Sequence, residues 1–152
     1  MSTGPPSTTP ALLRVPEPAC SVFPCLRNGP SERAALHLPV APRCNVQCVH
    51  CRRDGDCIHH SPRSSSARPL SVQQAVSYAL EALRREPRIC SVGVTGPGEP
   101  LANAGATFGT LSLIRAQHPE LPFFLATNGL AIVDHVATLV SLGVSLDRKS
   151  VV

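Results

Sequence analysis

Aromatic side chains are scarce in this chain of 152 residues, which has no Trp, one Tyr and four Phe. Apolar residues still make up 43% of the sequence, so the core has to be built mainly from Ala, Val and Leu. A chain of this length can bury the core of one ordinary domain. Small aliphatic side chains suit helices packed on a buried sheet, and the composition therefore favours an α/β fold over a β-sandwich.

Long apolar runs and a strong excess of one charge are also lacking. No stretch approaches the roughly 20 apolar residues that a membrane span needs. The N-terminus has no basic start followed by an apolar run, which argues against a secretory signal. The formal net charge is only +4, and the basic residues form no stripe that would indicate nucleic-acid binding. We therefore expect a cytoplasmic protein whose partners are neither membranes nor nucleic acids.

Cysteine, by contrast, is concentrated in one short segment. Within "RCNVQCVHCRRDGDC" lie four of the seven cysteines: Cys44, Cys48, Cys51 and Cys57. In a reducing compartment such clusters are more often metal ligands or catalytic groups than structural bridges. Disulfides, zinc, a redox thiol pair and an iron-sulfur cluster are the alternatives that this segment leaves open.

The spacing Cys44-x3-Cys48-x2-Cys51 bears on those alternatives. A structural zinc site usually takes four ligands from two separate C-x2-C pairs, and this segment contains one such pair. Three thiolates would leave one iron of a [4Fe-4S] cluster without a protein ligand, so that a small molecule could bind there. The spacing differs from the cysteine runs of bacterial and plant-type ferredoxins.

Hydrophobic periodicity predicts alternating strands and helices. Strands are expected at 36–40, in "ICSVGVTG" and in "FFLATNG". The segment "LSVQQAVSYALEALRREP" predicts a helix with a capping box formed by Ser71 and Gln74. Apolar residues at helical spacing predict two more helices. One contains Phe108, Leu111 and Ile114. The other contains Val133, Val136, Ala137 and Val140, and Gly143 is its expected stop. This order predicts right-handed βαβ units and a parallel sheet.

Composition divides the chain into three parts. Residues 1–34 are rich in Pro, Ser and Thr and are expected to be a disordered or loosely docked leader. Residues 35–146 carry the α/β pattern. The end of the chain, "SLDRKSVV", reads as a polar, basic tail without a strand pattern, and residues 147–152 are assigned to it.

Three unusual loops each follow a predicted strand directly: the cysteine segment, "GPGEP" and "TNG". Ligands of parallel α/β sheets bind at the carboxyl ends of the strands. The three loops are therefore predicted to meet at one edge of the sheet and to form the site.

The C-x3-C-x2-C spacing after the first strand of a βα array resembles the radical S-adenosylmethionine enzymes. The resemblance implies a partial (β/α) barrel, a [4Fe-4S] cluster held by the three motif cysteines, and S-adenosylmethionine bound to the open iron and cleaved to a 5′-deoxyadenosyl radical. It further assigns the cofactor pocket to Gly96, Pro97, Gly98, Glu99, Thr127, Asn128 and Gly129, with the Glu99 carboxylate facing the methionine ammonium.

Three quoted segments, "HLPVAPRCNVQCVHC", "GPGEPLAN" and "LATNGL", resemble the NifB family of nitrogenase cofactor maturases over roughly His37 to Val144. The resemblance implies synthesis of the iron-molybdenum cofactor precursor, with iron-sulfur donor and reductant proteins as partners. It also makes Cys57 and Cys25 ligands of further clusters, which are substrates. At the third-strand cysteine of the family stands Phe124, and the N-terminal His and the terminal C-x2-C are absent. Since the pattern covers about three βα units of six, we expect a C-terminally truncated fragment.

Three other functions stay open on the sequence. A related radical enzyme acting on an organic substrate would not need the missing cluster ligands. A zinc or electron-transfer module would use the cysteines without radical chemistry. A truncated, inactive product would expose a strand edge and an apolar face.

Overall fold

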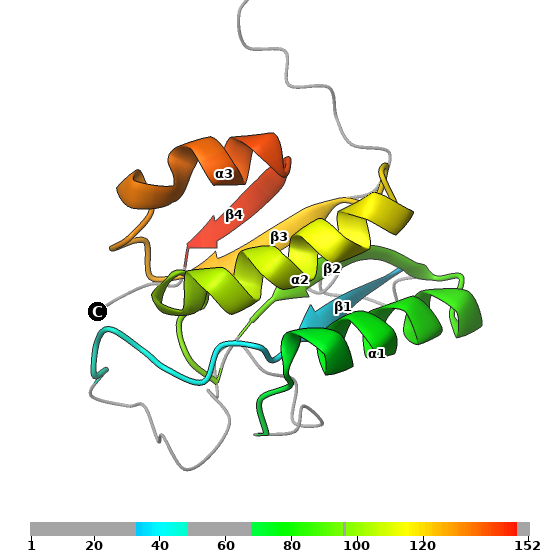
Figure 1. The fold of residues 1–152 in the computed structure, drawn as a ribbon, viewed down its shortest axis with the longest axis horizontal. Helices are drawn as coiled ribbons and strands as arrows, with labels where there is room; N and C mark the ends of the chain where they lie inside the picture. The colour runs from blue at the N-terminus through cyan, green and yellow to red at the C-terminus, as the bar shows by residue number, and fades with distance from the viewer. Residues whose placement is uncertain (1–32, 49–67, 96, 149–152) are drawn as a thin grey trace, which may run out of the picture.

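A parallel four-stranded sheet forms the centre of the structure, a computed structural model that describes residues 33–48, 68–95 and 97–148. Its strands lie side by side in chain order (Figure 1). They are β1 Ala34–Leu38, β2 Ile89–Val94, β3 Phe123–Thr127 and β4 Val144–Arg148. The first strand begins and ends two residues earlier than predicted, and the next two fall where the apolar runs place them.

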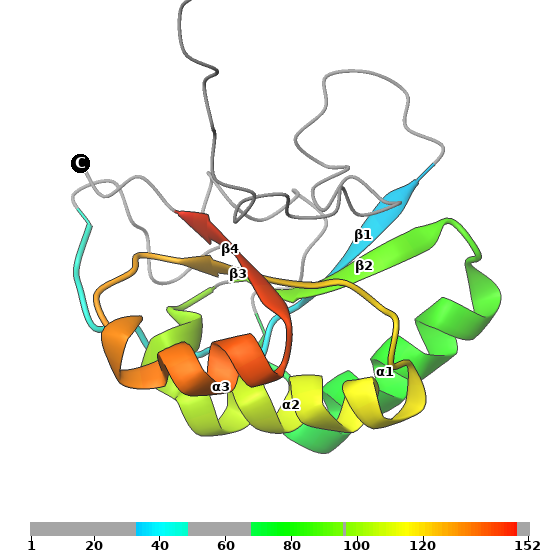
Figure 2. The same cartoon turned by 90° about the horizontal axis from the view of Figure 1, so that it is seen from above.

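Three α-helices cover one face of this sheet (Figure 2). They are α1 Val72–Arg85, α2 Ala104–Gln117 and α3 Val136–Ser141, and the short 3-10 helices η3 Pro100–Asn103 and η4 Val133–His135 precede α2 and α3. Strands alternate with helices as predicted, and the α/β fold is confirmed. Among the described residues, no helix has the length and apolar character to span a membrane.

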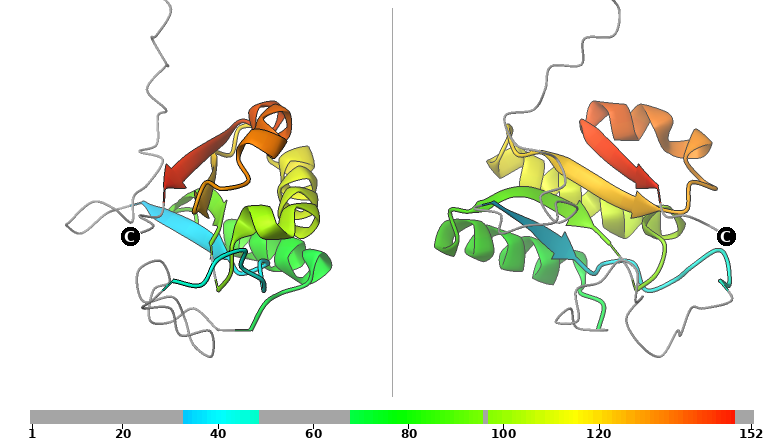
Figure 3. Two further views of the ribbon diagram at one scale, coloured as in Figure 1. Left: turned by 90° about the vertical axis from the view of Figure 1, so that its left-hand side faces the viewer. Right: turned by 180° about the vertical axis from the view of Figure 1, so that it is seen from behind.

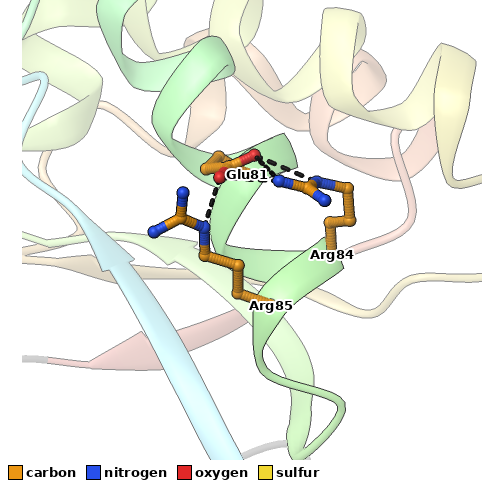
Figure 4. Close-up of polar contacts among 3 residues, drawn as sticks. All are labelled: Glu81, Arg84 and Arg85. Carbon is orange, nitrogen blue, oxygen red and sulfur yellow. Dashed lines mark hydrogen bonds and ion pairs between the residues drawn. The ribbon is translucent and has the colours of Figure 1, made fainter.

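Helix α1 shows how the local sequence determines an element. The Ser71 side chain accepts a hydrogen bond from the Gln74 amide and the Gln74 side chain accepts one from the Ser71 amide, so the predicted capping box is present. Ala75 and Ala79 face the sheet and are fully buried. On the solvent side Glu81 pairs with Arg84 and Arg85 (Figure 4). Such exposed pairs contribute little to stability.

The core lies between the helices and the sheet and is aliphatic apart from Phe123. Its fully buried side chains come from each layer: Leu38, Val92, Val94, Leu111, Ile114, Phe123 and Leu125. The Arg115 guanidinium lies over the Phe123 ring, 4.1 Å from its centroid, and donates to the carbonyls of Pro119, Leu121 and Leu142. Arg115 thus ties the loops at the amino ends of β3 and β4 to α2.

The end of the described chain corrects one prediction. Instead of a polar tail without strand structure, residues from Val144 to Arg148 form β4, which pairs in parallel with β3. Residues Val144 to Asp147 alternate apolar and polar with a period of two, which is the pattern of a half-buried strand, and Arg148 breaks the alternation. The polarity of its second half had concealed that alternation.

The buried side of α3 corrects a second prediction. The valines used to predict this helix point to solvent, with Val133 85% and Val140 74% exposed, and the buried residue is Leu139. The helix is present and ends before Gly143, whose φ of +60° is the left-handed conformation expected of a C-terminal stop. The predicted apolar face is therefore wrong, although the element and its end are right.

Candidate functional site

The loops that follow β1, β2 and β3 meet at the carboxyl edge of the sheet, as the sequence predicts. The segment after β1 runs along this edge toward the segment after β3 (Figure 3). The Gly98 amide donates to the Ala41 carbonyl (2.7 Å) and the Glu99 amide to the Arg43 carbonyl (2.8 Å), so the "GPGEP" segment pairs with the chain that leads into the cysteines. These two bonds continue the β1–β2 pairing beyond the ends of both strands.

Gly98 has to be glycine for this pairing. A Cβ atom built on Gly98 would lie well inside 3.0 Å of the carbonyl oxygens of Ala41 and Arg43. Those oxygens are backbone atoms that cannot move aside without breaking the hydrogen bonds they accept. The predicted cofactor residue Gly98 therefore has a packing role of its own.

Glu99 places a buried carboxylate at the junction of the loops. The residue is 1% exposed. One carboxylate oxygen, Oε1, accepts from the Thr127 hydroxyl (2.5 Å) and the Leu101 amide (3.2 Å), and Oε2 accepts from the Asn128 amide (2.7 Å). A carboxylate offers about four acceptor sites, and the donors from the described residues occupy three of them.

The "TNG" loop is held from both sides. The Asn128 side chain donates to the Asn45 side-chain oxygen (2.7 Å) and accepts from the Leu130 amide (3.0 Å). Gly129 has φ +84°, a conformation that L residues rarely adopt, and its amide donates to the Thr127 hydroxyl (3.1 Å). Asn45 lies between Cys44 and Cys48, so this bond joins the third loop to the cysteine loop directly.

Two of the predicted cluster ligands lie in the described part of the chain. Cys44 and Cys48 are free thiols, half-buried, on the loop after β1. Cys51, Cys57, Cys25 and Gly96 lie outside the described residues, and within the described ranges no three metal-ligating side chains come together. Cys90 is half-buried and lies near the amino end of β2, away from this edge. Thiols on a loop against the carboxyl edge are the donor type that an iron-sulfur cluster requires, and the described residues fit that group.

On the sheet face opposite the helices, His37, Gly93 and Phe124 stand in register across three strands. His37 is within hydrogen-bonding distance of the Thr95 hydroxyl (Nδ1 to Oγ1, 3.2 Å) and meets the Phe124 ring edge-on with centroids 5.3 Å apart. Burial lowers the pKa of His37 below its usual 6.5. Phe124 is 2% exposed and supplies no ligand atom at this position.

Asn103, which links two of these loops, was not singled out from the sequence. Its side-chain amide donates to the Arg43 carbonyl (2.7 Å) and the Glu99 carbonyl (2.8 Å). The residue ends "GPGEPLAN" at the start of a predicted helix, where Asn is a common cap. The position of Asn103 at the start of a helix could have drawn attention to it, but such a position predicts a helix cap and not a link between loops.

Fold and site together define a parallel α/β protein whose cysteine-bearing site is assembled from three strand-to-helix loops. No family model matches the chain. It is 41% identical over 140 residues to the FeMo cofactor biosynthesis protein NifB of Klebsiella pneumoniae, an alignment that covers 91% of this chain and 30% of that protein. It is 42% identical over 123 residues to NifB of Klebsiella oxytoca, covering 80% of this chain and 90% of that protein.

NifB of Chlorobaculum tepidum is 40% identical over 123 residues, covering 80% of this chain and 29% of that protein. The chain belongs to the family of FeMo cofactor biosynthesis proteins NifB. It spans about three tenths of the Klebsiella pneumoniae and Chlorobaculum tepidum relatives.

Proposed function

We propose that this chain forms the cluster-binding and S-adenosylmethionine-binding part of a radical enzyme in FeMo cofactor biosynthesis. The observation that carries the proposal is the meeting of three loops around the C-x3-C-x2-C segment, in a chain that belongs to the NifB family. Cys44, Cys48 and Cys51 would hold a [4Fe-4S] cluster. Its open iron would bind S-adenosylmethionine, whose reductive cleavage supplies the 5′-deoxyadenosyl radical.

The pocket for S-adenosylmethionine would be walled by Gly96 to Glu99 on one side and by Thr127 to Gly129 on the other. Glu99 would contribute negative charge toward the methionine ammonium through the acceptor capacity that Thr127, Leu101 and Asn128 leave. The backbone bonds of Gly98 and Glu99 to the cysteine loop would hold this wall at a fixed separation from the cluster.

The substrates would be iron-sulfur units, and Cys57 and Cys25 would hold them. We further propose iron-sulfur donor and reductant proteins as partners and the cytoplasm as the location, because thiolate-bound clusters require a reducing surrounding.

One observation favours a second function. Phe124 is buried at the position where the family resemblance implies a cluster-binding cysteine, and a phenyl ring cannot ligate iron. A radical enzyme of the same type acting on an organic substrate would not need that ligand.

Anaerobic reconstitution with iron and sulfide tests the proposal. The wild-type chain should bind about four irons for the motif cluster, and its reduced electron paramagnetic resonance spectrum should change when S-adenosylmethionine is added. Cys48→Ala should lose that signal, and Cys57→Ala should keep it. A chain that binds zinc and no iron would sink the proposal. Cleavage of S-adenosylmethionine without transfer to an iron-sulfur substrate would favour the organic-substrate function.

A further inference from the structure

Asn103 occupies the position that caps α2, but its side chain makes no capping hydrogen bond to that helix. Asn at such a position normally accepts from a backbone amide of the first turn, a bond worth about 1 kcal/mol. The first turn of α2 also carries no acidic residue that could compensate. The helix therefore begins without side-chain help, although a residue suited to provide it is present.

The side chain is used elsewhere. Asn103 is 7% exposed, and both of its side-chain hydrogen bonds are donated to loop carbonyls, those of Arg43 and Glu99. The Arg43 carbonyl also accepts from the Glu99 amide, so two donors converge on one oxygen. A carbonyl oxygen has two lone pairs, and both are engaged here.

The Arg43 carbonyl belongs to the peptide plane that contains the amide nitrogen of Cys44. The peptide group is planar, so fixing the direction of this C=O bond fixes the position of the Cys44 nitrogen and restricts the Cys44 Cα. The Cys44 amide nitrogen is thereby held from the second loop and from the residue that precedes α2. Cys44 is thus linked through one peptide group to the second loop and to α2.

We propose that Asn103 is a positioning residue for the cysteine loop: it holds the Arg43 carbonyl and so sets the direction in which Cys44 presents its thiol. The inference rests on the proposed function for the meaning of Cys44 as a cluster ligand. The anchoring itself is a property of the apoprotein and can be measured without a cluster. Asn103 would prepare the loop for the cluster at the expense of capping its own helix.

Two variants separate this role from a general structural one. Asn103→Ser removes both donors to the loop but can still cap α2, so it should keep the melting temperature within a few degrees of wild type. Asn103→Asp keeps the side-chain shape and turns acceptor oxygens toward the two carbonyls. The matched control is Thr107→Val, which removes the buried bond from the Thr107 hydroxyl to the Pro100 carbonyl (2.8 Å) without touching Arg43.

The first measurement is the alkylation rate of Cys44 relative to Cys48 in the reduced, metal-free protein, read by peptide mass spectrometry. In both Asn103 variants the Cys44 to Cys48 ratio should rise by roughly five-fold to ten-fold, because one lost anchor makes local opening easier by that factor. The ratio in Thr107→Val should equal that of wild type. An unchanged ratio in the Asn103 variants would overturn the inference. So would unfolding of both Asn103 variants while Thr107→Val stays folded, because Asn103 would then support the fold as a whole.

The second measurement is the loss of iron from reconstituted protein to an external chelator under anaerobic conditions. Both Asn103 variants should release iron about ten-fold faster than wild type and Thr107→Val, since a disoriented first ligand weakens the cluster. Equal release rates would contradict the inference for the loaded protein. If wild type takes up no cluster, the proposed function fails, and the alkylation ratio still decides the role of Asn103.

Discussion

Gly93 and Phe124 are register partners in the β2–β3 pairing, and the Phe124 ring fills the space that a side chain on Gly93 would need. A Cβ atom on Gly93 would lie well inside 3.0 Å of that ring. The ring is almost fully buried and also meets His37, so it has no free space to move into. Glycine in β2 and phenylalanine in β3 are therefore coupled, and a change at one position requires a change at the other.

Gly93→Ala should lower the free energy of unfolding by roughly 1 to 3 kcal/mol through overpacking, measured by urea titration. The double variant Gly93→Ala with Phe124→Cys should recover part of that loss, because the smaller side chain vacates the space. The control is Gly105→Ala in α2, where a Cβ meets nothing within 4 Å. Its free energy of unfolding should rise by roughly 0.5 to 1 kcal/mol. A Gly93→Ala protein as stable as wild type would show that the ring moves freely.

Glu99→Gln should weaken the junction of the loops. An amide has one acceptor oxygen and an NH2 group, so either the Thr127 hydroxyl or the Asn128 amide would face a donor. We expect a loss of roughly 1 to 3 kcal/mol in unfolding free energy. The exposed Glu120→Gln serves as the control and should change little.

In the folded Glu99→Gln protein, affinity for S-adenosylmethionine should fall by about ten-fold to a hundred-fold, with iron content unchanged. Equilibrium binding and iron analysis on one sample check both values. Reduced stability together with unchanged affinity would show that Glu99 acts only within the protein.

His37 should make the fold sensitive to acid. Burial lowers its pKa in the folded state below 6.5, so under mildly acidic conditions the unfolded chain binds a proton that the folded chain does not. Stability from this residue is complete above 6.5 and is lost as the pH falls from 6.5 toward the folded pKa, by at most about 1.4 kcal/mol per pH unit. His37→Gln should therefore show a flatter dependence of its urea midpoint between about pH 7 and 5. Parallel curves for the two proteins would refute a contribution from His37.

Arg115→Lys should lower the stability of the fold clearly, whereas Arg84→Lys should leave it nearly unchanged. The Arg115 fork reaches three carbonyls and lies over Phe123, which one ammonium cannot reproduce. We expect Arg115→Lys to lower the free energy of unfolding by roughly 1 to 3 kcal/mol. Arg84 pairs only with the exposed Glu81 in the described structure, and its replacement should cost less than about 0.5 kcal/mol. Thermal unfolding of both variants side by side gives the comparison.

Local patterns were enough to predict the elements and the edge where the site lies. The capping box of Ser71 and Gln74 lies within four residues, and the apolar runs of β2 and β3 are buried on both faces, so short windows of sequence contain the signal. The meeting of the loops follows from parallel topology, because all carboxyl ends share one edge.

The partners of individual side chains could not be predicted in this way. Glu99 was expected to face the cofactor, and its bonds to Thr127 and Asn128 span 28 and 29 positions of sequence. The buried side of α3 depends on which of its residues meets the sheet, and Leu139 does so in place of the valines. Both depend on how distant elements pack, which a periodic pattern does not encode.

The bond between Asn45 and Asn128 has a consequence for the order of events during synthesis. These residues are 83 positions apart, and the Arg43 carbonyl and Asn103 are 60 apart. A ribosome makes roughly 5 to 20 residues per second, so the cysteine segment emerges several seconds before the groups that hold it. During that interval the thiols are exposed to metals and oxidants without their final surroundings. If the segment holds a cluster as proposed, the cluster would have to be inserted after β3 is complete, because the ligands on the growing chain are not yet arranged.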